Sequence, residues 1–133
     1  MTRHPPRIAA RALILDRDRL LLVNAYPGGT SDLWCAPGGG VEAGQSLPDN
    51  LAREVHEETG HAVTAKEFVG TLCYEVNGRS KIVQFWRMHP NGGPARELMN
   101  DIKQVAWLPL EKAIRKLARP HEKAFLASAG CFE

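Results

Sequence analysis

The sequence contains few cysteines, and their arrangement excludes the common cysteine-based frameworks. Cys35, Cys73 and Cys131 are widely spaced, and no two of them form a CxxC pair. An odd, scattered set of this kind argues against a structural zinc site or a disulfide scaffold. Free thiols are typical of a reducing compartment, so we expect a cytoplasmic protein.

Long apolar runs and a strong charge imbalance are also missing. The first residues lack the apolar stretch of a signal peptide, and no segment is long and apolar enough to span a bilayer. The formal net charge is only +2, and the basic residues are scattered. We therefore expect no membrane and no nucleic-acid partner, and nothing in the sequence marks an oligomer interface.

The pattern of apolar runs and turn residues predicts one α+β domain over residues 1–133, since 133 residues suffice for one core but not for two. A polar turn between apolar runs predicts one hairpin, and Asn77-Gly78 predicts another. The expected strands cover residues 8–15, 20–23, 62–76, 81–88 and 104–108, and the expected late helices cover 110–117 and 121–127. This order predicts a mixed sheet with helices on both sides.

A further helix is predicted at about residues 46–59. Ser46 can cap it, Pro48 is tolerated in a first turn, and Asp49 gives a weak capping-box pattern. Gly60 suits the left-handed position that ends many helices. At about 100° per residue, the apolar positions of this segment form one buried stripe.

Three acidic residues of this helix lie along one boundary of the stripe. Glu58 falls inside it, Glu54 lies at its edge, and Glu57 lies one step further out. Like charges at these spacings destabilise a helix unless a cation neutralises them. Arg53 can pair with Glu57 at i, i+4, but one arginine cannot satisfy three carboxylates. Magnesium prefers oxygen ligands and is typically held by a few carboxylates and substrate phosphates. The pattern therefore favours a metal site over a solvated acidic face.

At this point the residues resemble a known family. Gly39 and the run Arg53-Glu54-Val55-His56-Glu57-Glu58-Thr59-Gly60 resemble the Nudix box, G-x5-E-x7-R-E-U-x-E-E-x-G-U, where U is bulky and apolar. Segments 34–42 and 105–111 are also similar to this family, so the resemblance covers nearly the whole chain. It implies a Nudix-type α/β/α sandwich whose catalytic helix is the one at about 46–59.

Two positions depart from the box. Gln45 replaces its first glutamate, and His61 replaces its final apolar residue. Gln45 keeps an acceptor oxygen but loses a charge, so we expect altered or reduced metal affinity rather than an inert protein. We expect His61 to be a structural substitution at the helix exit.

The resemblance implies a role for each matching residue. Glu54, Glu57, Glu58 and the backbone carbonyl of Gly38 would bind Mg2+, with Mn2+ as a substitute. Glu54, Arg53 and Glu57 would form the catalytic set, in which Glu54 is also the general base and Arg53 orients it by a charge-assisted hydrogen bond.

The surrounding loops would complete this site. The glycines let the backbone approach metal and phosphate closely, which makes Gly38, Gly39 and Gly40 the phosphate loop. In this family a further acid from a late loop often assists. Glu97 and Asp101 are the candidates here, and the alternative for each is a plain solvated acid.

Aromatic side chains suggest where a nucleobase would stack. The main candidates are Trp34 and Trp86, and the secondary candidates are Tyr74 and Phe85. Because Phe85 and Trp86 are adjacent on a predicted strand, they must face opposite sides of the sheet. Core packing is the competing interpretation for all four residues.

The resemblance implies a metal-dependent pyrophosphohydrolase that cleaves a diphosphate linkage in a nucleoside diphosphate derivative. The Pro-Gly-Gly-Gly-Val loop looks most like the MutT-like members, which favours a nucleoside triphosphate, intact or oxidised. Dinucleoside polyphosphates or diphosphoinositol polyphosphates are alternative substrates. The alternative from another class is a Nudix-fold module that binds a nucleotide without hydrolysing it, which Gln45 and His61 favour and the intact acids oppose.

Overall fold

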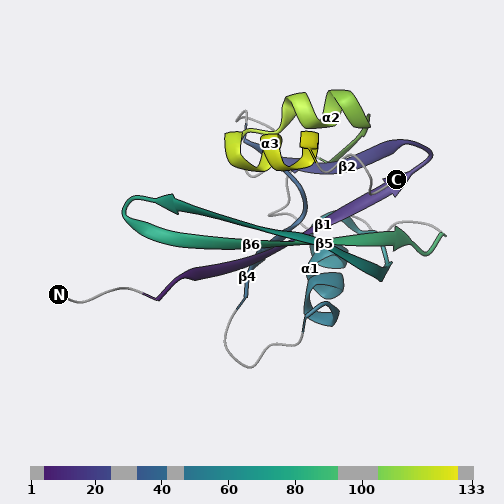
Figure 1. The fold of residues 1–133 in the computed structure, drawn as a ribbon. Helices are drawn as coiled ribbons and strands as arrows, with labels where there is room; N and C mark the ends of the chain where they lie inside the picture. The colour runs from purple at the N-terminus through teal and green to yellow at the C-terminus, as the bar shows by residue number, and fades with distance from the viewer. Residues whose placement is uncertain (1–4, 25–32, 42–46, 93–104, 129–133) are drawn as a thin grey trace.

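A computed structural model describes residues 5–24, 33–41, 47–92 and 105–128. Helices cover both faces of a mixed β-sheet, as the sequence predicts (Figure 1). The strands are β1 (Arg7–Asp16), β2 (Arg19–Asn24), β3 (Trp34–Cys35), β4 (Gly38–Gly40), β5 (Val63–Val76), β6 (Arg79–Pro90) and β7 (Val105–Pro109). The helices are α1 (Asp49–Thr59), α2 (Leu110–Lys116) and α3 (Pro120–Ser128).

Strand β1 connects the two halves of the sheet. Along most of its length it pairs in parallel with β6, from Arg7 opposite Lys81 to Ile14 opposite Met88. Its first half also pairs antiparallel with the short glycine strand β4. Its last residues turn to β2, which in turn pairs with β3 and β7. Strand β1 therefore holds the glycine strand in place beside its own first half.

Both predicted hairpins are confirmed. β1 and β2 are antiparallel, and so are β5 and β6. Asn77 and Gly78 have φ values of 52° and 77°, which a two-residue hairpin turn with two left-handed residues requires. Arg17 and Asp18 adopt the same region, with φ values of 50° and 65°.

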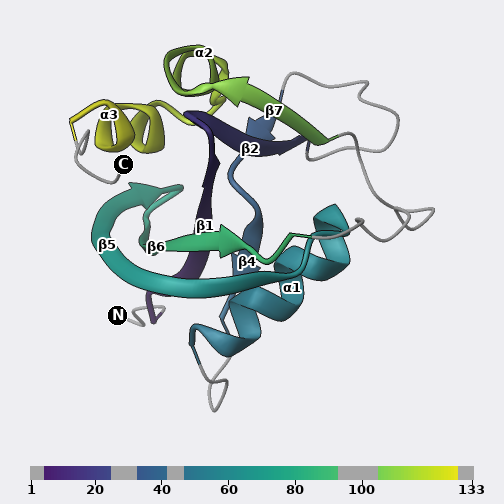
Figure 2. The same cartoon turned by 90° about the vertical axis from the view of Figure 1, so that its right-hand side faces the viewer.

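The alternation of side chains along the strands creates two apolar cores. Leu13 and Phe85 lie in the core beneath α2 and α3, whereas Ile14 and the half-buried Trp86 pack in the core that α1 covers. Phe85 and Trp86 thus face opposite sides of the sheet, as predicted. Figures 1 and 2 show α1 on one side of the strands and α2 and α3 on the other.

The helix α1 begins later than predicted. Its N-cap is Pro48, without a side-chain capping bond, and its first residue is Asp49. A proline disfavours helical backbone in the residue before it, so Leu47 is excluded from the helix and the capping-box prediction is wrong at this position. Ser46 lies outside the described residues. Gly60 ends the helix with φ 79°, as predicted. None of the helices in the described part of the chain is long and apolar enough to cross a membrane.

Candidate active site

Helix α1 packs on the sheet through a narrow apolar face, and its acidic residues lie along the edge of that face. Leu51 and Val55 are 1% and 0% exposed and pack against the sheet. Glu54 and Glu58 are half-buried, whereas Glu57 is exposed. The positions derived from the helical wheel are therefore confirmed, with two carboxylates held against the protein and one turned toward solvent.

The two half-buried carboxylates meet the glycine strand β4. The backbone N–H of Gly38 donates a hydrogen bond of 3.1 Å to Oε2 of Glu58. A Cβ atom at Gly39 would lie 2.6 Å from Oε2 of Glu54, so a side chain here would displace the end of this carboxylate. Gly38 has φ 145°, and a Cβ there would overlap the carbonyl oxygen of Ala10. The glycines thus allow the acids to approach the backbone.

A hydrogen-bond network on α1 orients the acids in a way that the sequence did not reveal. Nη1 of Arg53 donates to Oε1 of Glu57 at 2.6 Å, the pairing that the i, i+4 spacing predicts. Nη2 of Arg53 donates to Oδ1 of Asn50 at 2.7 Å, and Nδ2 of Asn50 donates to Oε1 of Glu54 at 2.9 Å. The predicted direct bond from Arg53 to Glu54 is replaced by this relay through Asn50, which lies one helical turn before both Arg53 and Glu54.

The electrostatic surroundings of Glu54 favour a group that accepts protons. Burial raises the pKa of Glu54, and the nearby charge of Glu57 raises it as well. The positive charges of Arg53 and Arg11 and the hydrogen bond from Asn50 lower this pKa and only partly offset the burial. A carboxylate with a raised pKa is a stronger base than an ordinary surface glutamate.

The predicted metal ligands are brought together only in part. Glu54, Glu58 and Gly38 lie at one place, whereas the carboxylate of Glu57 is 50% exposed and engaged by Arg53. Within the described ranges, no group of three or more acidic, histidine or cysteine side chains is close enough to hold a metal ion. The oxygen-only donors suit a hard cation such as magnesium. Gln45, Glu97 and Asp101 lie outside the described residues.

The remaining box departure, His61, is a packing residue. Its ring is half-buried and meets Trp107 edge to face, with centroids 5.5 Å apart and planes at 85°. This geometry is typical of a favourable aromatic pair, and it agrees with the predicted structural role.

A cavity of about 400 Å³ lies where the β5–β6 hairpin and the start of β1 meet the beginning of α3. Tyr74, Lys81, Arg119 and His121 contribute to its lining, and neither Trp34 nor Trp86 does. Trp34 packs on the core beneath α2, with Nζ of Lys116 5.1 Å from its ring centroid.

Neither of the two main stacking candidates lines this cavity, because both tryptophans pack against the cores. Trp86 lies on the α1 side and meets Phe68 edge to face. Of the two secondary candidates, Tyr74 lines the cavity and Phe85 is fully buried. Arg119 and His121 were not among the predicted site residues, because no local motif distinguishes them from ordinary residues at a helix start.

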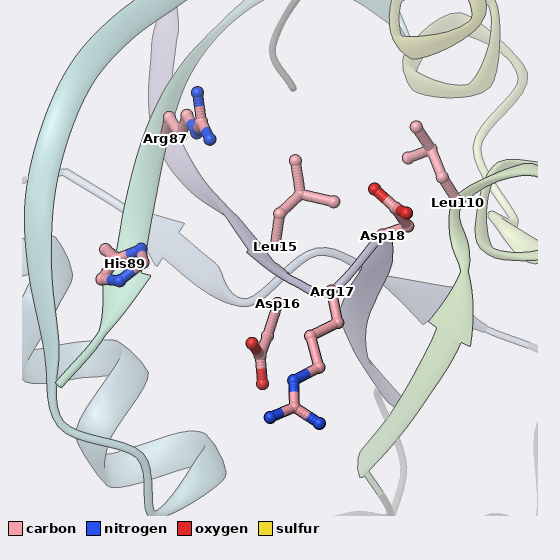
Figure 3. Close-up of a pocket in the computed structure, with 7 residues that line it drawn as sticks. All are labelled: Leu15, Asp16, Arg17, Asp18, Arg87, His89 and Leu110. Atoms are coloured by element: carbon pink, nitrogen blue, oxygen red, sulfur yellow. The ribbon is translucent and has the colours of Figure 1, made fainter. Parts of the chain in front are cut away.

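A second cavity, of about 220 Å³, lies at the opposite end of β1 (Figure 3). Its labelled side chains come from β6 on one side, and from the end of β1, the β1–β2 turn and Leu110 on the other. Around it, the negative charges of Asp16 and Asp18 balance the positive charges of Arg17 and Arg87. Arg87 is already paired with Glu67 at 3.3 Å. This mixed, largely exposed lining offers no concentration of one charge.

The sequence of this chain matches a known family and several of its characterised relatives. The family model described as NUDIX domain matches residues 5–128. A relative named 8-oxo-(d)GTP phosphatase from Mycolicibacterium smegmatis is 30% identical over 95 residues, which are 71% of this chain and 29% of the relative. A CTP pyrophosphohydrolase from Escherichia coli is 29% identical over 122 residues, which are 87% of this chain and 89% of that protein. This chain thus spans less than a third of the first relative and most of the second.

A solved structure of a NUDIX hydrolase from Nitrosomonas europaea has the same arrangement of elements. It superimposes with a TM-score of 0.77 at 27% sequence identity, covering 95% of this chain and 90% of that one. The two relatives carry the names of different nucleotide substrates. The comparisons therefore identify a family whose hydrolases act on phosphoric anhydride bonds and generally use divalent cations.

Proposed function

The chain belongs to the NUDIX family, and we propose that it is a magnesium-dependent pyrophosphohydrolase. Its substrate is a nucleoside diphosphate derivative, and within that class a nucleoside triphosphate, intact or oxidised. Manganese substitutes for magnesium. The observation that carries the proposal is the approach of Glu54 and Glu58 to the glycine strand, where the N–H of Gly38 bonds Glu58 and the absence of a side chain at Gly39 leaves room for Glu54.

The donors at this place fit a hard divalent cation. Glu54, Glu58 and the carbonyl oxygen of Gly38 would hold it, and Glu57 would join them by leaving the exposed ion pair with Arg53, which is worth little in water. When bound, the cation neutralises diphosphate charge and lowers the pKa of bound water. Glycine at 38–40 lets the phosphates approach the backbone.

The residues of α1 supply the remaining chemistry. Glu54 accepts the proton of the attacking water, a role that its raised pKa supports. Asn50 fixes one carboxylate oxygen of Glu54 and leaves the other at Gly39. The guanidinium of Arg53 donates hydrogen bonds to both Asn50 and Glu57, and it therefore orients the side chains on the acidic face of α1. Glu97 and Asp101 remain candidates for a further acid.

The decisive experiment is a substrate panel with magnesium or manganese. It includes nucleoside triphosphates, 8-oxo-dGTP, dinucleoside polyphosphates, diphosphoinositol polyphosphates, nucleotide sugars and ADP-ribose, and it measures release of phosphate or pyrophosphate. We expect turnover of a nucleoside triphosphate and its loss in Glu57→Gln. The matched control is Glu111→Gln, the same change at an exposed glutamate in the first turn of α2. Glu57→Gln and Glu58→Gln enzymes that match the parent on every substrate would overturn the metal-site assignment.

A second candidate function is nucleotide binding without hydrolysis. Two observations favour it: Gln45 replaces an acid of the box, and no three metal-binding side chains converge in the described part of the chain. Under this alternative, nucleotides bind but release no phosphate with either metal. The same panel, read by calorimetry as well as by product release, separates the two functions.

A further inference from the structure

The cavity of about 400 Å³ at the beginning of α3, here called the α3 cavity, is lined mainly by cations among its charged residues. Arg7 comes from the start of β1, Lys81 from β6, and Arg119 from the residue directly before α3. Among the described residues of the lining, Glu75 is the acidic one. It is exposed and follows Tyr74 on β5, so its side chain points away from the face that the Tyr74 ring occupies.

Two of these cations have no acidic partner in the described part of the chain. Arg7 is exposed and Lys81 is half-buried, and neither forms an ion pair with a described carboxylate. Nζ of Lys81 instead lies 5.8 Å from the ring centroid of Tyr74. Arg119 differs, because its Nε is 3.6 Å from Oε2 of Glu122, which is 2% exposed and lies outside the lining. The α3 cavity therefore keeps at least two uncompensated positive charges.

The cations around the α3 cavity repel one another. Burial lowers the pKa of Lys81, and the positive charges of Arg119, Arg11 and Arg7 lower it further, whereas the charge of Glu122 raises it. The charged form of Lys81 is therefore less favourable here than in water. A negative charge bound within a few ångströms would offset this repulsion, because an opposite charge nearby favours a protonated lysine. The electrostatics of the cavity thus favour an anionic ligand.

The size and the donors of the α3 cavity fit a small oxyanion. Its volume is within the usual range of small-molecule sites. Arginine presents donors in a planar fork and lysine presents a compact charge, and both commonly bind phosphate. The side chain of Arg119 is 29% exposed, so it contributes to the lining despite its ion pair. We propose that the α3 cavity binds a phosphate dianion, free or as a phosphate monoester, through Arg7, Lys81 and Arg119.

This anion site is separate from the acids of α1. Tyr74 packs on the core beneath α2 and α3, whereas α1 covers the core on the other side of the sheet. Figure 2 shows α3 and α1 on opposite sides of the strands. Without a metal ion the clustered carboxylates of α1 repel phosphate, so binding to the metal-free protein reports the α3 cavity. The inference rests on no part of the proposed function, and either can fail without the other.

The test measures binding of inorganic phosphate and of methyl phosphate to the metal-free protein by calorimetry, at an ionic strength held constant with sodium chloride. We expect saturable binding at one site in the parent. Lys81→Met removes the charge but keeps an apolar stem, and it should weaken binding about 10-fold, the effect of losing one charge-assisted contact. Arg7→Met makes the same test at an exposed position, where folding is least disturbed. Lys112→Met, at an exposed lysine of α2, is the control and should bind like the parent.

Amide chemical shifts in NMR spectra of the parent locate the bound ion and need no variant. Changes centred on Arg7, Lys81 and Arg119 support the site, whereas changes confined to other residues overturn it. Absence of saturable binding by either probe overturns it as well, and so does equal affinity of the parent, Lys81→Met and Arg7→Met. Binding of inorganic phosphate alone identifies the free ion as the ligand, and binding of methyl phosphate as well extends the site to monoesters; both results support the proposal.

Discussion

Oε2 of Glu54 lies 2.6 Å from the position that a Cβ atom would occupy at Gly39. The carboxylate most suited to act as a base is therefore in contact with the backbone of the glycine strand. This relationship couples a residue at the centre of α1 to a strand that pairs with the first half of β1. Alanine substitutions at Gly38, Gly39 and Gly40 are therefore expected to have different effects.

Gly39→Ala is expected to lower kcat/KM by about 100-fold with little loss of stability. The added methyl group displaces the flexible end of Glu54, and misplacement of a catalytic group by about 1 Å has an effect of that size. Gly40→Ala is the control, since its Cβ would meet nothing nearer than the carbonyl oxygen of Ile8 at 3.9 Å. Steady-state kinetics and thermal denaturation measure both effects. Equal activity of the two variants would show that the contact with Glu54 is unimportant.

Gly38→Ala is expected to destabilise the fold itself. Its φ of 145° disfavours a side chain, and the new Cβ would overlap the carbonyl oxygen of Ala10 on β1. Together we expect a loss of about 3 kcal/mol in the free energy of unfolding. Gly78→Ala separates the strain of a positive φ from the overlap with Ala10, because Gly78 has φ 77° but no atom within 4 Å of its Cβ position. This variant should lose about 1 kcal/mol in the free energy of unfolding. Chemical denaturation of both variants checks this difference.

Asn50→Ala is expected to lower kcat about 10-fold, because it removes a hydrogen bond to the charged Glu54 and breaks the relay to Arg53. The hydrogen bond from Asn50 lowers the pKa of Glu54. Its removal should raise that pKa and move the acidic limb of the pH–rate profile to higher pH. Asp49→Ala, at the exposed neighbouring position, is the control. A fall in kcat with an unmoved acidic limb would indicate a merely structural role for Asn50.

Glu54→Gln is expected to make the metal-free protein more stable at neutral pH. Burial raises the pKa of Glu54 above its ordinary value of 4.5, so the folded state binds this proton more tightly than the unfolded state. The free energy of unfolding contributed by this group therefore falls as pH rises from 4.5 through the folded pKa. The Tm of the variant should exceed that of the parent at neutral pH, and the difference should vanish below about pH 4.

Magnesium should raise the Tm of the parent more than that of Glu54→Gln, because binding to the folded state stabilises it and the variant lacks a charged ligand. Thermal melts across pH, with and without magnesium, test both statements. A variant that is less stable than the metal-free parent at neutral pH would contradict the stated effect of burial on Glu54.

Local sequence determined the features that depend on neighbouring residues. The period of the apolar positions fixed which face of α1 is buried, and Asn77-Gly78 fixed a hairpin because both residues tolerate a left-handed backbone. The i, i+4 spacing anticipated the ion pair of Arg53 with Glu57. The start of α1 was misplaced because the restriction imposed by Pro48 outweighed the capping pattern.

Only the tertiary structure decided which distant groups meet. In sequence, Glu122 is an ordinary acid in the first turn of a helix, and glutamate is mostly exposed in folded proteins. Packing of α3 on the sheet buries it beside Arg119 and couples it to Tyr74. Likewise, the spacing of the box singled out Gly39 among the three glycines, but only the fold shows that Gly39 faces Glu54 and that Gly40 does not. Residue types and spacing therefore specified the helix and its acids, whereas the close contacts that orient them depend on chain segments that meet only after folding.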